Sequence, residues 1–346
     1  MSRTPNKMPY NATDRPLVTF ALFAYNQEAF ICEAIEGAFA QTYEPLEIIL
    51  SDDCSSDRTY EIMQEMAVAY NGPHVVRVRR SDANRGLINH VCDVTEILNG
   101  KFVLLAAGDD ISKPNRTTRL LTIWGDQYHA IMSKCDLIDE RGVVIKTNWL
   151  PDGNVNNRLP WLKAVSHPLF VYGASSAYQS DVLRKLPRSD KKIFSEDTPL
   201  NLIIQLSTGK ANLCDESLVF YRVHNATLSN SLAIEPRPSA IFQHEKRREN
   251  QIELQRSLLI YLRDKIIIPM RANKSINEHK LNREIELCDV RLKWYKARLF
   301  SRFAMTFTAP KEMQKWFILR VLGLQVYSFI KAAALRVGFQ RSLPKG

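Results

Sequence analysis

Short apolar runs alternate with amphipathic segments along the first third of the chain. Residues 17–23 (LVTFALF) are apolar, rich in strand formers and too short for a helix. Across 28–40 the apolar residues recur at helical spacing, which predicts a helix. The alternation continues with strands predicted at 46–50, 75–78 and 102–106 and helices at 58–70 and 87–98. Strands separated by helices of about 12 residues predict right-handed crossovers and a mostly parallel sheet covered on both faces.

Polar residues follow each predicted strand directly. In chain order they are Ala24, Tyr25, Asn26 and Glu28, then Asp52 and Asp53, then Arg85, then Asp109 and Asp110. Ligands of such sheets bind beyond the carboxyl ends of the strands, so these residues are expected at one edge. Asp and Asn are also common turn residues, which explains either acidic pair alone. Two pairs on one edge favour a binding site.

Phosphate binding through a glycine-rich helix start is excluded by the sequence. The first strand-to-helix turn has no G-x-G-x-x-G motif, and the chain has no G-x-x-x-x-G-K-[ST] motif. A bound diphosphate therefore needs another source of positive charge. The adjacent carboxylates of Asp109 and Asp110 suit Mg²⁺ or Mn²⁺, which prefer oxygen ligands and bridge phosphates.

The net charge of +10 is concentrated at the carboxyl end of the 346-residue chain. Residues 270–346 hold 16 Lys and Arg against 5 Asp and Glu, whereas residues 1–269 hold 31 against 32. The six cysteines form no C-x-x-C pair, and residues 1–15 lack the apolar run of a signal peptide. We therefore expect a cytoplasmic protein without a zinc site or a disulfide framework. Nucleic-acid binding is a weak alternative, because the basic tail has no recognisable motif for binding nucleic acids.

Residues 16–230 resemble the family 2 glycosyltransferases, enzymes of the GT-A fold that use nucleotide-sugar donors. The matching segments are FAYNQE at 23–28, AQTYEPLEIILSDDCSSD at 40–57, NRGL at 84–87 and GDDISKPNR at 108–116. The resemblance implies a Rossmann-like α/β sheet flanked by helices, with a C-terminal helical appendage. It also implies inverting transfer of a sugar to a hydroxyl of a saccharide or lipid-linked acceptor, in bacterial surface polysaccharide synthesis.

The resemblance also implies the roles of the residues at the sheet edge. Donor-binding roles, with a UDP-sugar as the expected donor, fall on Ala24, Tyr25, Asn26, Glu28, Asp52, Asp53, Arg85 and Asp109. Asp110 and Asp109 occupy the D-x-D metal motif, with Asp110 as the direct ligand, and His224 is expected at the metal or the phosphates. Ala107 stands at the first acidic position of the motif, so two consecutive carboxylates replace the spaced pair.

Two segments of the second half carry the expected acceptor side. Gly173, Ala174 and Ser175 are either the floor of an acceptor pocket or a tightly packed strand. The segment FSEDTPL at 194–200 has the composition of a helix start with Ser195 as N-cap. The resemblance makes Asp197 the catalytic base and Glu196 its partner, either orienting it or binding the acceptor.

Four regions are predicted: a flexible tail at 1–15, a donor half at 16–125, an acceptor half at 126–230 and basic helices at 231–346. A helix over 311–341 either lies on an anionic membrane surface or packs on the catalytic domain or a second subunit. Two other function classes stay open from the residues alone. They are a nucleotidyltransferase on a related fold and a non-catalytic protein that binds nucleotide sugars.

Overall fold

The computed structural model describes residues 14–150, 169–193, 195–224, 241–271 and 276–297, with a few positions between 305 and 314. The chain divides into two compact units. The sheet unit comprises Met1–Glu235 with Ser257–Glu278, and the helical unit comprises Pro236–Arg256 with His279–Gly346. All of the predicted site residues belong to the sheet unit.

The first half of the sheet unit alternates strands and helices in the predicted order. Its elements are β1 Val18–Ala24, α1 Ile31–Phe39, β2 Leu46–Asp52, α2 Thr59–Ala69, β3 Val75–Arg80, α3 Leu87–Ile97 and β4 Phe102–Ala107. Each overlaps its predicted segment, so the prediction of alternating strands and helices is confirmed. Strands β1 and β2 are buried along their whole length, as expected for a sheet covered on both faces.

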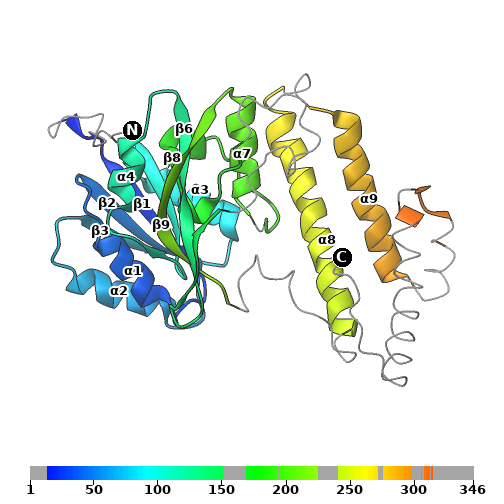
Figure 1. Ribbon diagram of the computed structural model, residues 1–346. Coiled ribbons are helices and arrows are strands. Elements are labelled where there is room, and N and C mark those ends of the chain that lie inside the picture. Colours follow the sequence, from blue (N-terminus) through cyan, green and yellow to red (C-terminus); the bar gives the residue numbers. More distant parts are fainter. Residues whose placement is uncertain are drawn as a thin grey trace, which may run out of the picture. The chain divides into compact units, whose positions relative to one another are not determined.

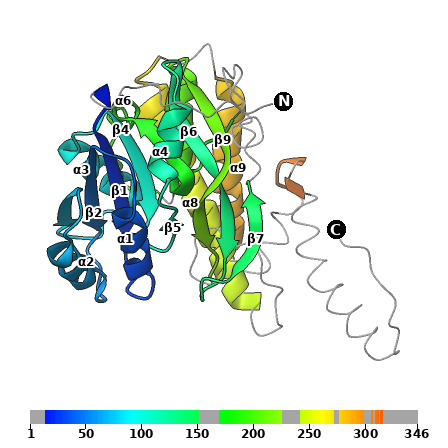
Figure 2. The same cartoon turned by 60° about the vertical axis from the view of Figure 1, so that its left-hand side comes forward.

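The strand order reverses beside β1, which creates the edge where ligands bind in such folds. The described strands form a sheet in the order β3-β2-β1-β4-β8-β6-β9-β5, with β7 added on β6. β1 pairs in parallel with both β2 and β4 (Figure 2). Right-handed crossovers then place α1 and α2 on one face and α3 on the other, because the chain changes direction after β3. Loops after β1, β2 and β4 therefore meet at the switch point.

The core beneath this edge is apolar and continuous. Alternate residues of β1, among them Phe20 and Leu22, face the apolar stripe of α1 that contains Ile31 and Ile35. The neighbouring strands add Ile48, and all of these side chains are fully buried. Their burial removes apolar surface from water and fixes the strands whose ends carry the polar loops.

The second half of the sheet unit is mixed, as the sequence indicates. Its elements are β5 Ile111–Ser112, α4 Arg116–Thr122, β6 Tyr128–Ile138, β7 Val144–Trp149, the 3₁₀ turn η2 Gly173–Ser175, β8 Ser176–Gln179, α6 Ser180–Leu183, α7 Asp197–Leu206, β9 Lys210–Arg222 and the π-helix η5 Leu262–Ile267. The fully buried Arg116 joins the two halves. Its guanidinium donates to the carbonyl of Leu105 at 2.8 Å and to that of Ser176 at 3.2 Å.

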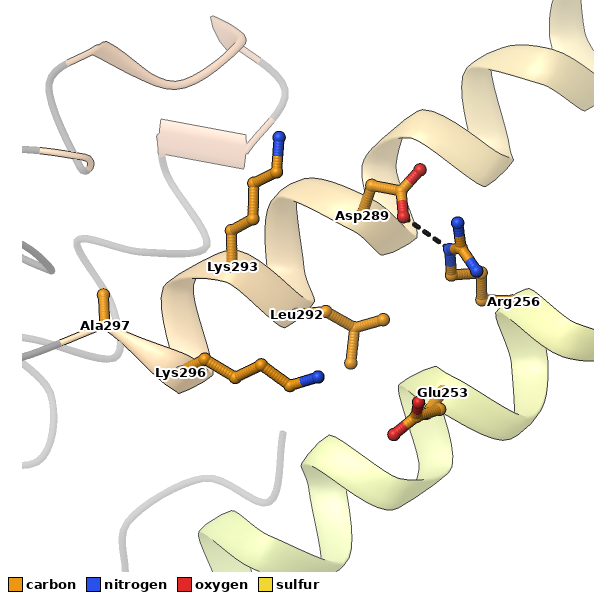
Figure 3. Close-up of a pocket in the computed structure, with 7 residues that line it drawn as sticks. All are labelled: Glu253, Arg256, Asp289, Leu292, Lys293, Lys296 and Ala297. Carbon is orange, nitrogen blue, oxygen red and sulfur yellow. Dashed lines mark hydrogen bonds and ion pairs between the residues drawn. The ribbon is translucent and has the colours of Figure 1, made fainter.

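The helical unit contains most of α8 Ile241–Tyr261 and of α9 Glu278–Lys296 (Figure 1). An ion pair joins Arg256 of α8 to Asp289 of α9. A hollow of about 420 Å³ lies beside this pair (Figure 3), lined by Glu253, Arg256, Asp289, Leu292, Lys293, Lys296 and Ala297. Most of the helix predicted over 311–341 lies outside the described residues. Within the described residues, no helix is both long and apolar enough to cross a membrane.

Candidate active site

The loop after β2 is held by two buried aspartates. Asp52 accepts a hydrogen bond from the amide of Ser55 at 2.9 Å and lies 3.4 Å from the guanidinium of Arg80. The two carboxylate oxygens of Asp53 accept the amides of Arg85 and Gly86 at 3.0 and 2.9 Å. Asp53 therefore fixes the loop after β3 against the loop after β2. Its two oxygens keep further lone pairs for a ligand.

The turn after β1 is clasped to the same loop. Asn26 has a left-handed backbone with φ of 52°, and its side-chain oxygen accepts the amide of Ser56 at 2.8 Å. Glu28 accepts the amide of Arg58 at 2.9 Å and donates its own amide to Asp57 at 3.1 Å. Asn26 and Glu28 thus hold the loop in shape.

Four of the expected donor-binding residues are exposed at this edge, namely Tyr25, Asn26, Glu28 and Arg85. Tyr25 follows β1 and is 45% exposed. The Arg85 side chain is 46% exposed and lies 3.4 Å from Asp93. Because one offers an aromatic face and the other a mobile guanidinium, they are the groups best placed to contact a base or a phosphate.

A buried network that the sequence did not indicate supports the end of β2. The hydroxyl of Ser51 lies 2.6 Å from Nε2 of His90 and accepts a hydrogen bond from Arg79 at 2.8 Å. Arg79 also lies 3.2 Å from Asp93. Burial, followed by the charge of Arg79, lowers the pKa of His90 to about 3, so this histidine is neutral at physiological pH. Its role is to support the loops from below.

The loop after β4 places two acids and a histidine together. Asp109 and His224 lie 3.0 Å apart between Oδ2 and Nε2. Asp110 is buried, and its Oδ1 accepts the amide of Arg222 at 2.8 Å. Arg222, also fully buried, donates to the carbonyl of Asp109 at 2.9 Å and to Glu33 at 2.5 Å. Arg222 therefore ties the end of β9 to the acidic loop, which brings His224 to Asp109.

The residues of this acidic loop suit a divalent cation. Oδ2 of Asp110 is buried without a hydrogen-bond partner among the described residues. Burial, followed by the charge of Asp109, raises the pKa of Asp110 well above its usual value. The carboxylates of Asp109 and Asp110 are the oxygen ligands that Mn²⁺ and Mg²⁺ prefer. In the described part of the chain, however, no group of three such side chains is arranged to hold a metal, so other ligands must complete the coordination.

The expected base lies at the start of α7, where it contacts the 3₁₀ turn η2. The amide of Gly173 donates to Oδ1 of Asp197 at 2.5 Å. A Cβ at position 173 would overlap Oε1 of Glu196, so a larger residue requires the Glu196 carboxylate to move. Burial raises the pKa of Glu196, which also hydrogen-bonds Asp197. The two acids therefore form a hydrogen-bonded pair at the start of α7, packed against the turn η2.

A fully buried asparagine on α7 holds this arrangement. Asn201 accepts the amide of Val171 and donates to its carbonyl, both at 2.8 Å, as a neighbouring strand would. It also donates to the carbonyl of Asp197 at 2.8 Å. The helix that begins with Asp197 is thereby attached to the chain just before η2. Glu196, and not the predicted Ser195, occupies the N-cap position.

The base and the acidic loop share a buried neighbourhood. Burial and then the charge of Asp110 raise the pKa of the Cys135 thiol to about 12, and Ser175 hydrogen-bonds the same thiol. Tyr178, fully buried on β8, has its pKa raised by burial and by Asp197 and Glu196. Gly173 and Ser175 are buried and Ala174 is half-buried. The burial of Gly173 and Ser175 favours the packing interpretation of this turn.

Comparison with known proteins agrees with this architecture. Residues 19–186 match the family model described as glycosyl transferase family 2. An uncharacterized glycosyltransferase of Haemophilus influenzae is 26% identical over 270 residues, which are 76% of this chain and 79% of that protein.

Two solved structures share the fold. TarS 1–349 of S. aureus in complex with UDP-GlcNAc aligns with a TM-score of 0.52 and 15% identity, over 87% of this chain and 78% of that one. The mannosyltransferase PcManGT of Pyrobaculum calidifontis, in complex with GDP-Man and Mn²⁺, aligns with a TM-score of 0.52 and 13% identity, over 98% and 92%. These likenesses confirm the predicted GT-A fold.

Gly173→Ala tests the contact between η2 and the acid pair. We expect a stability loss of about 1–3 kcal/mol in denaturant unfolding, because the new methyl group displaces the Glu196 carboxylate. Gly125→Ala is the matched control, since its nearest neighbour would lie 3.6 Å away, an ordinary contact. Adding Glu196→Ala to Gly173→Ala should restore most of the loss. A double variant no more stable than Gly173→Ala would contradict the contact.

Proposed function

We propose that this chain, a family 2 glycosyltransferase whose residues 19–186 match the family, transfers a sugar from a nucleoside-diphosphate donor to an acceptor hydroxyl with inversion. The observation that carries this proposal is the fixed carboxylate pair at the start of α7. The backbone amide of Gly173 fixes the orientation of the Asp197 carboxylate, as a general base requires. Single displacement needs such a base and no protein nucleophile.

Asp197 is the proposed base. As the acceptor oxygen attacks the anomeric carbon, its proton passes to the Asp197 carboxylate, and the bond to the diphosphate oxygen breaks. Glu196 hydrogen-bonds Asp197 and is proposed to orient it; burial raises the pKa of Glu196, and the hydrogen bond with Asp197 lowers it. The Gly173 amide and Asn201 hold the carboxylate in the orientation that this transfer needs.

The donor is proposed to lie across the ends of β1, β2 and β4, with UDP as its nucleotide. Tyr25 and Asp53 face the base and ribose, with Ala24, Asn26, Glu28 and Asp52 shaping the pocket and Arg85 and Asp109 near the phosphates. Asp110, Asp109 and His224 are the proposed protein ligands of a divalent metal, Mn²⁺ or Mg²⁺, and because these side chains are not arranged around a common point, ligands from outside the chain would complete the site. When bound, such a metal neutralises the diphosphate as the leaving group. The Mn²⁺ in the mannosyltransferase of the same fold supports this part of the proposal.

The acceptor is proposed to be a saccharide or a lipid-linked saccharide in bacterial surface polysaccharide synthesis. Asp197, at the start of α7, can accept a proton from a sugar hydroxyl placed beside it. For a lipid-linked acceptor we place the enzyme at the inner face of the plasma membrane. There the basic residues of 270–346, 16 in number, would contact anionic headgroups. The alternative partner of these helices is a second subunit.

Asp197→Asn should lower the turnover number by a factor of at least about 100, because the amide cannot accept the acceptor proton. Dissociation constants for the donor should change by less than about threefold, since Asp197 lies on the acceptor side. The donor is selected first from a panel of nucleotide sugars by protection against thermal unfolding, and release of nucleoside diphosphate then reports turnover.

Asp181→Asn is the matched control for this variant. Asp181 lies on α6 of the same sheet unit, its side chain is 82% exposed, and it pairs locally with Arg184 at 3.2 Å. This control should keep wild-type turnover. Turnover by Asp197→Asn close to that of the wild type would show that another group is the base.

Flotation with liposomes tests the membrane part of the proposal. The full chain should float with vesicles that contain phosphatidylglycerol and remain behind with neutral vesicles or at high salt, because the attraction is electrostatic. A variant truncated after residue 309 should lose flotation. Equal flotation of the truncated and full chains would contradict a role for the tail.

A further inference from the structure

We propose that Asn89 is a positioning residue that couples the donor loop at Arg85–Gly86 to the chain segment leading to the Asp197 base. The inference rests on the proposed transfer reaction, because it concerns how the donor and base sides of that reaction are held together. Neither the family match nor the sequence motifs assign a role to Asn89. It lies in the first turn of α3, one turn beyond the donor loop.

Asn89 bridges two segments that are 100 residues apart in the sequence. Its side-chain nitrogen donates to the carbonyl of Ser189 at 2.8 Å and to that of Arg85 at 3.2 Å. Its side-chain oxygen accepts the amide of Ser189 at 2.9 Å. Ser189 is buried. A single neutral side chain thus satisfies both backbone groups of a buried residue, which only a carboxamide of this length can do.

On the donor side, the bridge ends at the loop that Asp53 holds. Asp53 accepts the amides of Arg85 and Gly86, and Asn89 holds the carbonyl of Arg85. Gly86 has a φ of 76°, a conformation that glycine adopts without strain. A ligand that contacts Asp53 or Arg85 therefore acts on a loop with little freedom of its own. Movement of that loop reaches Asn89 directly.

On the base side, the bridge ends at a segment with its own internal bonds. The hydroxyl of Ser189 donates to the carbonyl of Lys191 at 2.7 Å and accepts its amide at 3.2 Å. Arg188 pairs with Asp93 at 2.7 Å and with Glu96 at 2.6 Å, which ties the segment to α3 a second time. Asp197 follows Ser189 by eight positions. The proposed coupling passes from Ser189 along this connection to the start of α7; residue 194 within it lies outside the described residues.

The coupling predicts a specific kinetic signature. Without Asn89 the Asp53 contacts remain, so donor affinity should hold while the base loses its alignment with the acceptor. A misplacement of about 1 Å can cost a factor of about 100 in rate. Asn89→Ala should therefore lower kcat at least tenfold and change the donor KM less than about threefold. Asn71→Ala, which removes an exposed and purely local bond to the carbonyl of Ala69, is the matched control and should behave as wild type.

Hydrogen–deuterium exchange separates coupling from a purely structural role. In the wild type, Mn²⁺ with UDP, or with GDP if the thermal panel selects it, should slow exchange at residues 85–88 and also at 186–193. In Asn89→Ala the slowing should persist at 85–88 and disappear at 186–193. Asn71→Ala should show slowing at both.

Two results would overturn the proposal, and they are distinguishable from a failure of the proposed function. Slowing at both segments in Asn89→Ala, or an unchanged kcat in that variant, contradicts the coupling while transfer by the wild type stands. A wild-type protein that neither binds any nucleotide of the panel nor turns over contradicts the proposed function itself, and the coupling with it.

Discussion

The in-register parallel pairing of β1 with β2 and β4 is the constraint on which the rest of the site depends. Ala24 pairs with Asp52 and Phe23 with Ala107, so three loops leave the sheet at one level. The fully buried apolar residues of these strands fix that level, because a slip by one residue would turn them toward the opposite face. The polar residues of the site lie close together because the core beneath them permits one register.

Hydrogen bonds from side chains to backbone then give the loops their shape. Asp53 and Asn26 each hold a neighbouring loop through its amides, and Asn201 does the same for the chain before η2. Such bonds satisfy backbone groups that secondary structure leaves open. Residues that the motifs assign to the donor therefore also hold the backbone around it, and a variant at these positions changes both.

Much of the fold and part of the site could be predicted from the sequence. The alternating apolar pattern placed the strands and helices, and the topology rule placed Asp53 and Asp110 at one edge. The family resemblance, and not the local pattern, identified Asp197 as the candidate base. Arg222, Asn89 and the Ser51–His90 pair could not be found this way, because their contacts join residues 39 to 189 positions apart. No local pattern marks such partners. N-cap preference favours Ser195, but the structure begins α7 one residue later, with Glu196 at the N-cap position and its side chain packed on Gly173.

Anomalous diffraction from crystals of the protein grown with Mn²⁺ and the selected nucleoside diphosphate tests the central claim most directly. That claim is that one sheet edge gathers the donor, its metal and the base. The manganese peak should lie within coordination distance of a carboxylate oxygen of Asp109 or Asp110, with the nucleotide over Tyr25 and Asp53. A manganese peak away from the Asp109–Asp110 loop, or a nucleotide bound elsewhere on the chain, would contradict the account.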